Sequence, residues 1–452
     1  MRIAFHTLGC KVNQYESEAM AALFRQRGHL VVDEREFADV YVINTCTVTA
    51  EADRKSRQYI RRMKNVNPDS IVAVTGCYAQ TRPDEVAGVE GVDIVTGTNE
   101  KSSLPGIVEE YAEQGKQRVM RVRPLSELKE YEDTGIVTSA ENRIRAFIKI
   151  QEGCNRFCSY CVIPYARGEV RSRPSGDILT EAEKLIRGGY KEIVLTGINT
   201  ALYGTEPGFV DEPGPGHGAG AEPSGIAPVI AALDRMEGDF RIRLSSLEPA
   251  VVDAAYVRRL LPYRRLCHHL HLSAQSGSDG VLAAMNRPYR RAQYFEIVRT
   301  MREADPEYGI STDLIAGFPG EREEDVKDTL DLIRQCGFCR THVFRYSRRP
   351  LTSAARRTDQ IPSGVKSDRS RRLQEAGDAA AAAFFRQCAG KTRRVLWETY
   401  SVEERLLSGY TDNYIRVRRD AGEEEGESRV NTFEDVRLGE PFRDGVRAER
   451  KP

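Results

Sequence analysis

The stretch Gly153-Cys154-Asn155-Arg156-Phe157-Cys158-Ser159-Tyr160-Cys161 decides the fold. Cysteine is scarce in this chain, 10 in 452 residues, yet three cysteines fall here within eight positions at C-x3-C-x2-C spacing. The apolar run 146–150 predicts a strand, so the cysteines lie on the loop that follows it. Thiolates hold iron–sulfur clusters, and a cubane normally takes four of them. Three cysteines would leave one iron open to a cofactor or substrate.

Two other interpretations fit three clustered cysteines. A distant His or Cys could complete a zinc site, or the thiols could be buried and structural. Zinc sites usually pair one C-x2-C with another, and no second pair stands nearby. The iron–sulfur interpretation is therefore favoured.

The motif C-x3-C-x-aromatic-C resembles that of the radical S-adenosylmethionine (SAM) superfamily, with Tyr160 in the aromatic position. The resemblance implies a [4Fe-4S] cluster on Cys154, Cys158 and Cys161. It places the SAM amine and carboxylate on the open iron and Tyr160 near the adenine. It also implies a partial (β/α)6 barrel whose site lies at the carboxyl ends of the strands.

Residues 144–375 carry the pattern of such a barrel, six strand-like runs separated by helical segments. The runs are 146–150, 192–195, 241–244, 268–272, 310–315 and 341–344. Small or polar residues follow these strands and are predicted to contact SAM: Thr196, Gly197, Ser245, Glu248, Gln275 and Gly317. Glycines after strands are mostly turn residues, but four such segments in register with the cysteine loop favour a site. We expect His268, His269 and His271 to pack in the core or behind the site, and residues 205–228 to form a flexible insertion.

Residues 1–111 alternate strands and helices, which predicts a parallel α/β domain. Cys10, Cys46 and Cys77 directly follow its first three strands, 36 and 31 residues apart. Because ligands bind beyond the carboxyl ends of parallel strands, we expect these thiols to converge on a second cluster. Three separate buried thiols are the alternative. A polar linker, 112–143, connects this domain to the barrel.

The three early cysteines narrow the resemblance to the methylthiotransferases, which carry a second [4Fe-4S] cluster in an N-terminal domain. The stretch from Gly9 to Glu18, GCKVNQYESE, looks like the branch acting on threonylcarbamoyladenosine in tRNA. Related branches replace the pair Lys11-Val12. Residues 389–445 look like the TRAM module, a small OB-like β-barrel that holds RNA.

This resemblance implies methylthiolation of carbon 2 of threonylcarbamoyladenosine at tRNA position 37. SAM, tRNA, a sulfur donor and a low-potential electron donor, flavodoxin-like or ferredoxin-like, are the implied partners. The same chemistry on isopentenyladenosine in tRNA or on a ribosomal-protein aspartate is one alternative. A non-enzymatic, zinc-dependent RNA-binding protein is the other.

Charge supports a polyanion partner only locally, because 67 basic residues balance 67 acidic ones overall. Residues 340–372 hold ten basic residues against two acids, net +8, with Tyr346 as a possible stacking surface. The basic helix near 53–64 is either an RNA contact or a plain solvated face. We expect the acidic run 423–427 to be a loop facing away from RNA. The predicted phosphate contacts are Arg171, Arg173, Arg348, Arg349, Arg393 and Arg394.

The N-terminus shows no apolar core followed by a cleavage site, and no run of 18 apolar residues occurs. We therefore expect a cytoplasmic protein that does not enter the membrane. In that compartment, cysteines serve as metal ligands or buried thiols more often than as disulfides.

Overall fold

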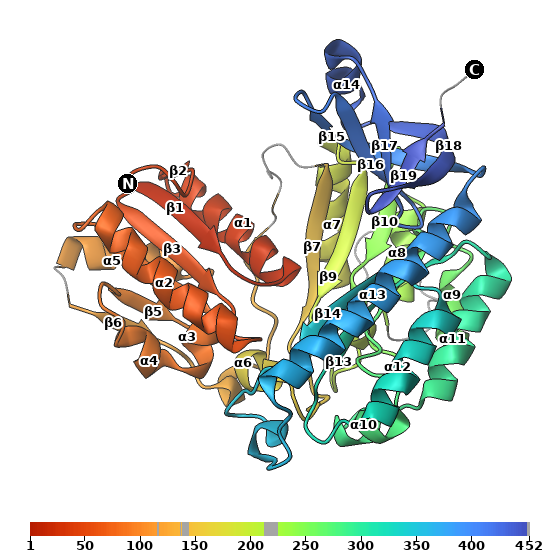
Figure 1. Ribbon diagram of the computed structural model, residues 1–452. Helices are drawn as coiled ribbons and strands as arrows, with labels where there is room; N and C mark the ends of the chain where they lie inside the picture. The colour runs from red at the N-terminus through yellow and green to blue at the C-terminus, as the bar shows by residue number, and fades with distance from the viewer. Residues whose placement is uncertain (115–116, 136, 138–143, 212–224, 450–452) are drawn as a thin grey trace.

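The computed structural model describes residues 1–114, 117–135, 137, 144–211 and 225–449. Figure 1 shows an N-terminal domain in red and orange, a central barrel, and a small blue barrel that carries the C-terminus. The predicted class, an α/β protein with a terminal β-barrel, is confirmed. No helix among the described residues is long and apolar enough to cross a membrane.

The N-terminal domain is a six-stranded parallel sheet with helices on both faces, as Figure 1 shows. Its strand order is β2-β1-β3-β4-β5-β6, and Ile3, Val42 and Val74 in the central strands are fully buried. The last strand falls within the stretch expected to be a linker, and it pairs with β5. The elements are β1 (Arg2–Thr7), α1 (Lys11–Gln26), β2 (Leu30–Val32), β3 (Val40–Thr45), α2 (Ala50–Val66), β4 (Ile71–Gly76), α3 (Cys77–Thr81), α4 (Pro83–Ala87), β5 (Ile94–Thr96), α5 (Leu104–Gln114) and β6 (Val119–Arg121).

The central barrel has two four-stranded sheets, β10-β9-β7-β8 and β11-β12-β13-β14, whose strands pair in parallel except for β8, which is antiparallel to β7. A parallel bridge between Ile242 and Leu266 joins them. One continuous core, which includes Ile148, Leu195 and Ile310, fills the space between strands and outer helices. The strands and principal helices are β7 (Arg145–Glu152), α6 (Ile163–Arg167), β8 (Arg171–Ser172), α7 (Ser175–Arg187), β9 (Glu192–Gly197), α8 (Ala227–Asp234), β10 (Arg241–Leu244), β11 (Ser246–Leu247), α9 (Ala254–Leu260), β12 (His269–Leu272), α10 (Asp279–Ala284), α11 (Arg291–Ala304), β13 (Gly309–Ala316), α12 (Glu323–Cys336), β14 (Arg340–Arg345) and α13 (Ser363–Cys388).

The predicted insertion, 205–228, lies partly outside the described residues, which omit 212–224. Its last two residues already belong to α8.

The C-terminal module is a closed five-stranded barrel, ordered β15-β16-β17-β19-β18, around the fully buried Trp397. The strand β19 pairs with both β17 and β18 and closes the barrel. The acidic run is a short helix, α14 (Glu423–Arg429), rather than the expected loop; three glutamates in its first turn complement the helix dipole. The strands are β15 (Thr392–Ser401), β16 (Leu406–Thr411), β17 (Arg416–Asp420), β18 (Phe433–Phe442) and β19 (Gly445–Ala448).

The small barrel docks at the amino ends of the central barrel's strands. Arg243 on β10 donates to the carbonyls of Thr411 (3.3 Å) and Asp412 (3.1 Å). Gly309 lies so close to the loop at Asn413 that a Cβ there would meet its carbonyl oxygen at 2.1 Å. The loop after β16 therefore seals one end of the central barrel.

Candidate active site

The barrel's cysteine loop, residues 153–161, starts where β7 ends. Gly153 has φ of +72°, and a Cβ there would lie 1.7 Å from the Glu169 carbonyl oxygen, so only glycine fits. Backbone N–H groups fix both ends of the loop: Cys154 donates to Gly168 (2.9 Å) and Ser159 to Met285 (2.9 Å). The chain thus holds its three cysteines on a well-defined turn.

Those three thiols are partly exposed and close enough to affect one another. Burial raises the pKa of Cys161 to about 12, and the charges of Cys158 and Cys154 add to that effect. Burial likewise raises the pKa of Cys154 to about 11. A metal must displace the thiol proton to bind, so a bound cation would hold these residues as thiolates.

Cys10, Cys46 and Cys77 follow β1, β3 and β4, and the structure brings them together at one edge of the sheet. Gly9 (φ +108°) makes the approach possible, because a Cβ there would lie 3.0 Å from the Cys46 sulfur. Burial raises the pKa of Cys46 to about 12, and the charges of Cys77 and Cys10 raise it further. The scattered cysteines therefore converge into one group.

Within the described residues, no three His, Cys, Asp or Glu side chains converge tightly enough to chelate a single metal ion. A cubane binds each cysteine to a different iron, so its ligands stand farther apart than those of one zinc ion. All ten cysteines are free thiols. Both triads fit an iron–sulfur cluster in donor type and number.

Some of the residues predicted to contact SAM line a cavity, and the others contact groups inside the protein. Thr196, Gly197 and Ser245 line the cavity, and the Ser245 hydroxyl is a buried polar group without a hydrogen-bond partner among described residues. Such an orphaned group is expected where a ligand would complete the hydrogen bonding.

The other four predicted contacts have partners of their own. Glu248 accepts from Arg287 (2.6 Å) and Asn199 (2.9 Å). Gln275 adopts a left-handed φ of +63°, a strained conformation typical of functional sites. Tyr160 packs against an apolar cluster, and the Lys366 side chain covers Gly317, where a Cβ would meet its Cγ at 2.1 Å.

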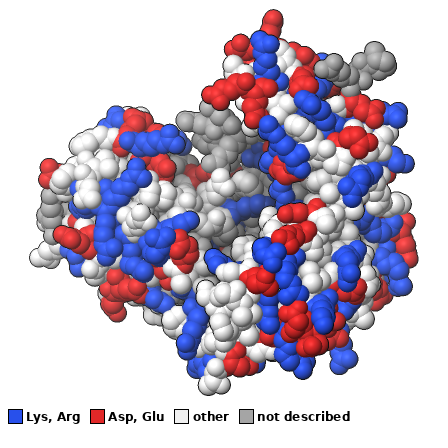
Figure 2. All heavy atoms as spheres, in the orientation of Figure 1, with Lys and Arg blue, Asp and Glu red and all other residues white. Residues whose placement is uncertain are grey.

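A cavity of about 540 Å³ runs between the N-terminal domain and the interior of the barrel. The loop Gly9–Val12 forms one wall, strand residues of the barrel form the others, and Tyr414 of the small barrel lies at the far end. Figure 2 shows the hollow between the two domains from outside. Cys10 and three of the predicted SAM residues, Thr196, Gly197 and Ser245, therefore face one chamber.

Sequence reasoning missed part of this chamber. His269 and His271 were expected to pack in the core or behind the site, but both line the cavity and both contact the Ser311 hydroxyl at 2.9 Å. Residues two apart on a strand share a face, so their spacing held the signal. Asp313, which bonds His271 at 2.9 Å, and the exposed ring of Phe344 also line the wall.

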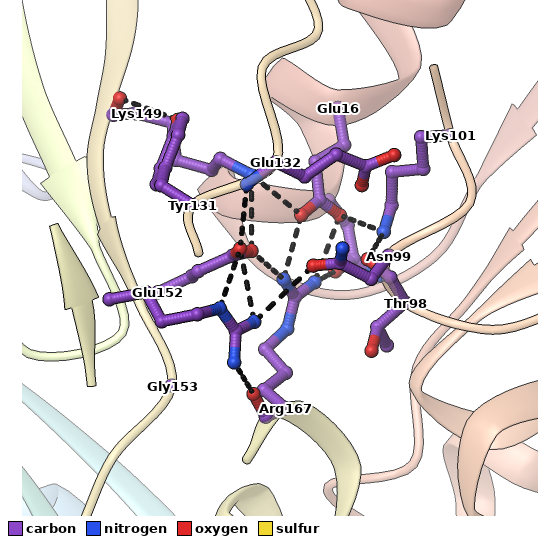
Figure 3. A network of polar contacts seen from close by, with 12 residues as sticks. Glu16, Thr98, Asn99, Lys101, Tyr131, Glu132, Lys149, Glu152, Gly153 and Arg167 are labelled. Carbon is purple, nitrogen blue, oxygen red and sulfur yellow. Dashed lines mark hydrogen bonds and ion pairs between the residues drawn. The ribbon is translucent and has the colours of Figure 1, made fainter. Parts of the chain in front are cut away.

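A buried charge network joins the N-terminal domain to the barrel (Figure 3). Glu16 on α1 receives both terminal nitrogens of Arg167, at 2.7 and 2.9 Å, and neither side chain is exposed to solvent. Lys149 (3.3 Å) and Lys101 (3.4 Å) also pair with Glu16. Arg167 lies six residues after Cys161 and lowers the pKa of Cys77, against the effect of burial. A guanidinium from the barrel thus reaches into the N-terminal domain beside its cysteines.

Several arginines predicted to bind phosphate serve this internal framework instead. Arg171 and Arg173 are each 2% exposed and pair with Glu152 and Glu181. Their carboxylate partners remove them from any surface that RNA could reach in this arrangement.

Of the other four predicted phosphate contacts, two are buried or paired inside the protein and two are exposed. Arg349 is also 2% exposed, and it donates to Asp53 (2.6 Å) and Thr47 (2.7 Å), anchoring the segment after Cys46. Arg393 pairs with Asp305 and Glu307, whereas Arg348 and Arg394 stay exposed.

The predicted stacking residue is buried as well. Tyr346 is 5% exposed and packs against Phe318, so it offers no surface to a base. By contrast, α2 keeps Lys55, Arg61 and Arg62 at the surface. Figure 2 shows basic side chains over this face of the N-terminal domain.

Comparison with known proteins identifies both large domains. Residues 2–97 match Uncharacterized protein family UPF0004, and residues 148–333 match the Radical SAM superfamily. A solved structure of the radical SAM methyltransferase TsrM from Kitasatospora setae, with cobalamin and a [4Fe-4S] cluster bound, superposes with a TM-score of 0.56. It shares 16% identity over 78% of this chain and 77% of that one. Fold and cysteine loop together define a radical SAM protein.

Curated relatives identify the family to which this chain belongs. Threonylcarbamoyladenosine tRNA methylthiotransferase MtaB of Bacillus subtilis is 39% identical over 98% of this chain and 95% of its own length. The protein of the same name from Aquifex aeolicus is 39% identical over 94% and 98%. The tRNA-2-methylthio-N(6)-dimethylallyladenosine synthase of Desulfosudis oleivorans is 35% identical over 88% and 83%. This chain belongs to the MtaB-type family of tRNA methylthiotransferases.

Proposed function

We propose that this chain transfers a methylthio group to carbon 2 of threonylcarbamoyladenosine at position 37 of tRNA, in the cytoplasm. The observation that carries the proposal is a chamber between the two domains, which a cysteine of the N-terminal triad lines on one side and strand ends of the barrel line on the other. Cys10 lines that chamber together with Thr196 and Ser245 of the barrel. The two cysteine-bearing segments also lie on packed elements, because α3 begins at Cys77 and packs against α6, which starts two residues after Cys161.

The chemistry requires cofactors, because the hydrogen on carbon 2 of adenine is not acidic enough for an ordinary general base. A [4Fe-4S] cluster on each triad, together with SAM, would supply one-electron and sulfur-transfer chemistry when bound. Cys154, Cys158 and Cys161 would hold the first cluster, and Cys10, Cys46 and Cys77 the second. The methyl group would come from SAM, the sulfur from a sulfur donor, and electrons from a flavodoxin-like or ferredoxin-like protein.

The protein's own part is to orient and to enclose. The Ser245 hydroxyl and Thr196 present polar groups to a ligand in the chamber, and Gln275 holds its strained turn at the same strand ends. Glu16 and Arg167 fix the N-terminal cysteines against the barrel. Tyr414 and the loop around it close the opposite end against water.

For the RNA we propose a path across the exposed basic residues. The N-terminal domain contributes Lys55, Arg61 and Arg62, which are exposed on α2. The central barrel contributes Arg348, and the small β-barrel contributes Arg394. Exposed Lys and Arg contacts to phosphates supply affinity that falls with salt. The buried arginines contribute to the scaffold instead.

The test is nucleoside mass spectrometry of tRNA from a strain lacking this gene. The wild-type gene should restore 2-methylthio-threonylcarbamoyladenosine, whereas Cys154→Ala and Cys10→Ala should not. Cys336→Ala is the matched control, because Cys336 is buried between helices away from both triads and should allow restoration. Full restoration by Cys10→Ala would overturn the role of the second triad.

The second candidate is the same reaction on an N6-alkenyl adenosine, which the 35% identity to the Desulfosudis oleivorans enzyme favours. Purified, reconstituted protein should be offered tRNA carrying either nucleoside. Turnover of the alkenyl substrate alone would replace the first proposal by the second. Reconstitution should give about eight irons per chain for two cubanes, and about four for one.

A further inference from the structure

Three cationic side chains of the lysine and arginine type line the described part of the chamber: Lys11, Arg243 and Arg340. Two of them are engaged. Arg243 is 2% exposed and donates to Glu192 at 2.8 Å. Arg340 lies over the Tyr414 ring at 5.5 Å and pairs with Asp444 at 3.7 Å.

The Lys11 ammonium is different, because it has no hydrogen-bond or ion-pair partner in the part of the chain that the structure describes. Its side chain is accessible to solvent but reaches among groups of the barrel interior. Arg243, Arg340 and Tyr414 line the same chamber as Lys11. An ammonium beside other cations gains stability when an anion enters.

We propose that Lys11 binds the carboxylate of the threonylcarbamoyl substituent and so selects this nucleoside. The inference rests on the proposed function and assigns it a specificity-determining residue. Lys11 directly follows Cys10, so a substituent held there keeps the adenine beside the N-terminal cysteines. The exposed Phe344 ring offers the base an apolar face, and Asp313 offers an acceptor to the substituent's hydroxyl.

Lys11 would also reject the wrong substrate. A dimethylallyl group has no charge, so in this chamber it would cover the ammonium without pairing with it, and a desolvated unpaired charge is unfavourable. A relative that acts on such a nucleoside shares 35% identity with this chain. A single cation at the chamber wall can therefore separate two substrates within one fold.

The experiment measures binding by fluorescence anisotropy, with the full-length protein and two anticodon stem-loop RNAs. One RNA carries threonylcarbamoyladenosine, and the other carries its methyl ester, in which a methyl group caps the carboxylate and removes its negative charge. We expect the wild type to prefer the carboxylate by about 10- to 100-fold, as for a hydrogen bond to a charged group. Lys11→Gln should lose this preference, and Lys11→Arg should retain most of it.

Lys184→Gln is the matched control, since Lys184 is an exposed lysine on the outer helix α7 and its loss should change nothing. Thermal unfolding and iron content verify that Lys11→Gln is folded and loaded. Equal weakening of both RNAs by Lys11→Gln would mean a phosphate contact and would overturn the inference. So would an undiminished carboxylate preference in that variant. Failure of the wild type to modify threonylcarbamoyladenosine in tRNA would instead refute the proposed function.

Discussion

Replacing Glu16 by glutamine should loosen the contact between the N-terminal domain and the barrel. Glu16 is fully buried, receives two hydrogen bonds from Arg167, and has two lysines within 3.4 Å. Removing its charge leaves three cations facing a neutral amide. Breaking a buried ion pair by removing one partner typically costs about 3–5 kcal/mol, so we expect a loss in this range.

A double-mutant cycle measures the coupling. The variants are Glu16→Gln, Arg167→Gln and the double substitution, each unfolded in urea at pH 7 and followed by circular dichroism. The control cycle uses Glu51 and Arg54, an exposed pair on α2 with side chains 53% and 60% accessible. Exposed pairs contribute about 0–1 kcal/mol. If Glu16→Gln shifts the first unfolding transition no more than Glu51→Gln does, the reasoning is refuted.

Lowering the pH should reproduce the loss of stability that we expect for Glu16→Gln. Burial alone would raise the pKa of Glu16, but Arg167, Lys101 and Lys149 overcome it and hold that pKa far below its ordinary value. The same kind of competition lowers the pKa of Glu152 to about 2. A depressed carboxyl pKa gives stability that is complete above the unfolded value, about 4.3, and is lost as pH falls through the folded one. Glu16→Gln should therefore weaken the stability loss between about pH 4 and pH 2.

Three further predictions concern the loops and joints. Gly153→Ala should halve the bound iron, because the added Cβ would overlap a carbonyl oxygen at 1.7 Å and distort the cysteine loop. Arg349→Met should speed hydrogen exchange in the segment after Cys46, because it leaves Asp53 buried without its partner. The hydrogen bond that His268 donates to the Asp305 carboxylate raises the pKa of His268. Stability from that pair is present below the unfolded histidine pKa and lost as pH rises through the folded one, so His268→Gln should remove this alkaline loss.

The first two of these predictions have matched control variants. Gly189→Ala also places alanine at positive φ (+90°) but meets no atom within 4 Å, so it should keep its iron. Arg348→Met removes the neighbouring exposed arginine and should leave the exchange rates unchanged. An alkaline loss that persists in His268→Gln, measured by thermal unfolding across pH 6 to 9, would contradict the third prediction.

The strand-and-cysteine pattern was readable from the sequence because it is local. A cysteine placed directly after a buried strand needs only the strand's direction to find its edge, so both triads could be located. The roles of the predicted RNA-binding arginines were not readable, because a sequence shows a charge but not its partner: Arg349 lies 296 residues from Asp53, and Arg393 lies 88 from Asp305. Those long-range carboxylates turned predicted RNA contacts into scaffold.

The loop around Tyr414 has a practical consequence for anyone dissecting this protein. Because that loop closes one end of the central barrel, the C-terminal module forms part of the wall of the chamber and does not serve only to bind RNA. Cutting the chain after α13 would remove this loop and let water reach Arg243 and His269. A shortened protein should therefore no longer exclude water from its chamber. This defect should appear even with a free nucleoside as substrate, for which binding to the rest of the tRNA plays no part.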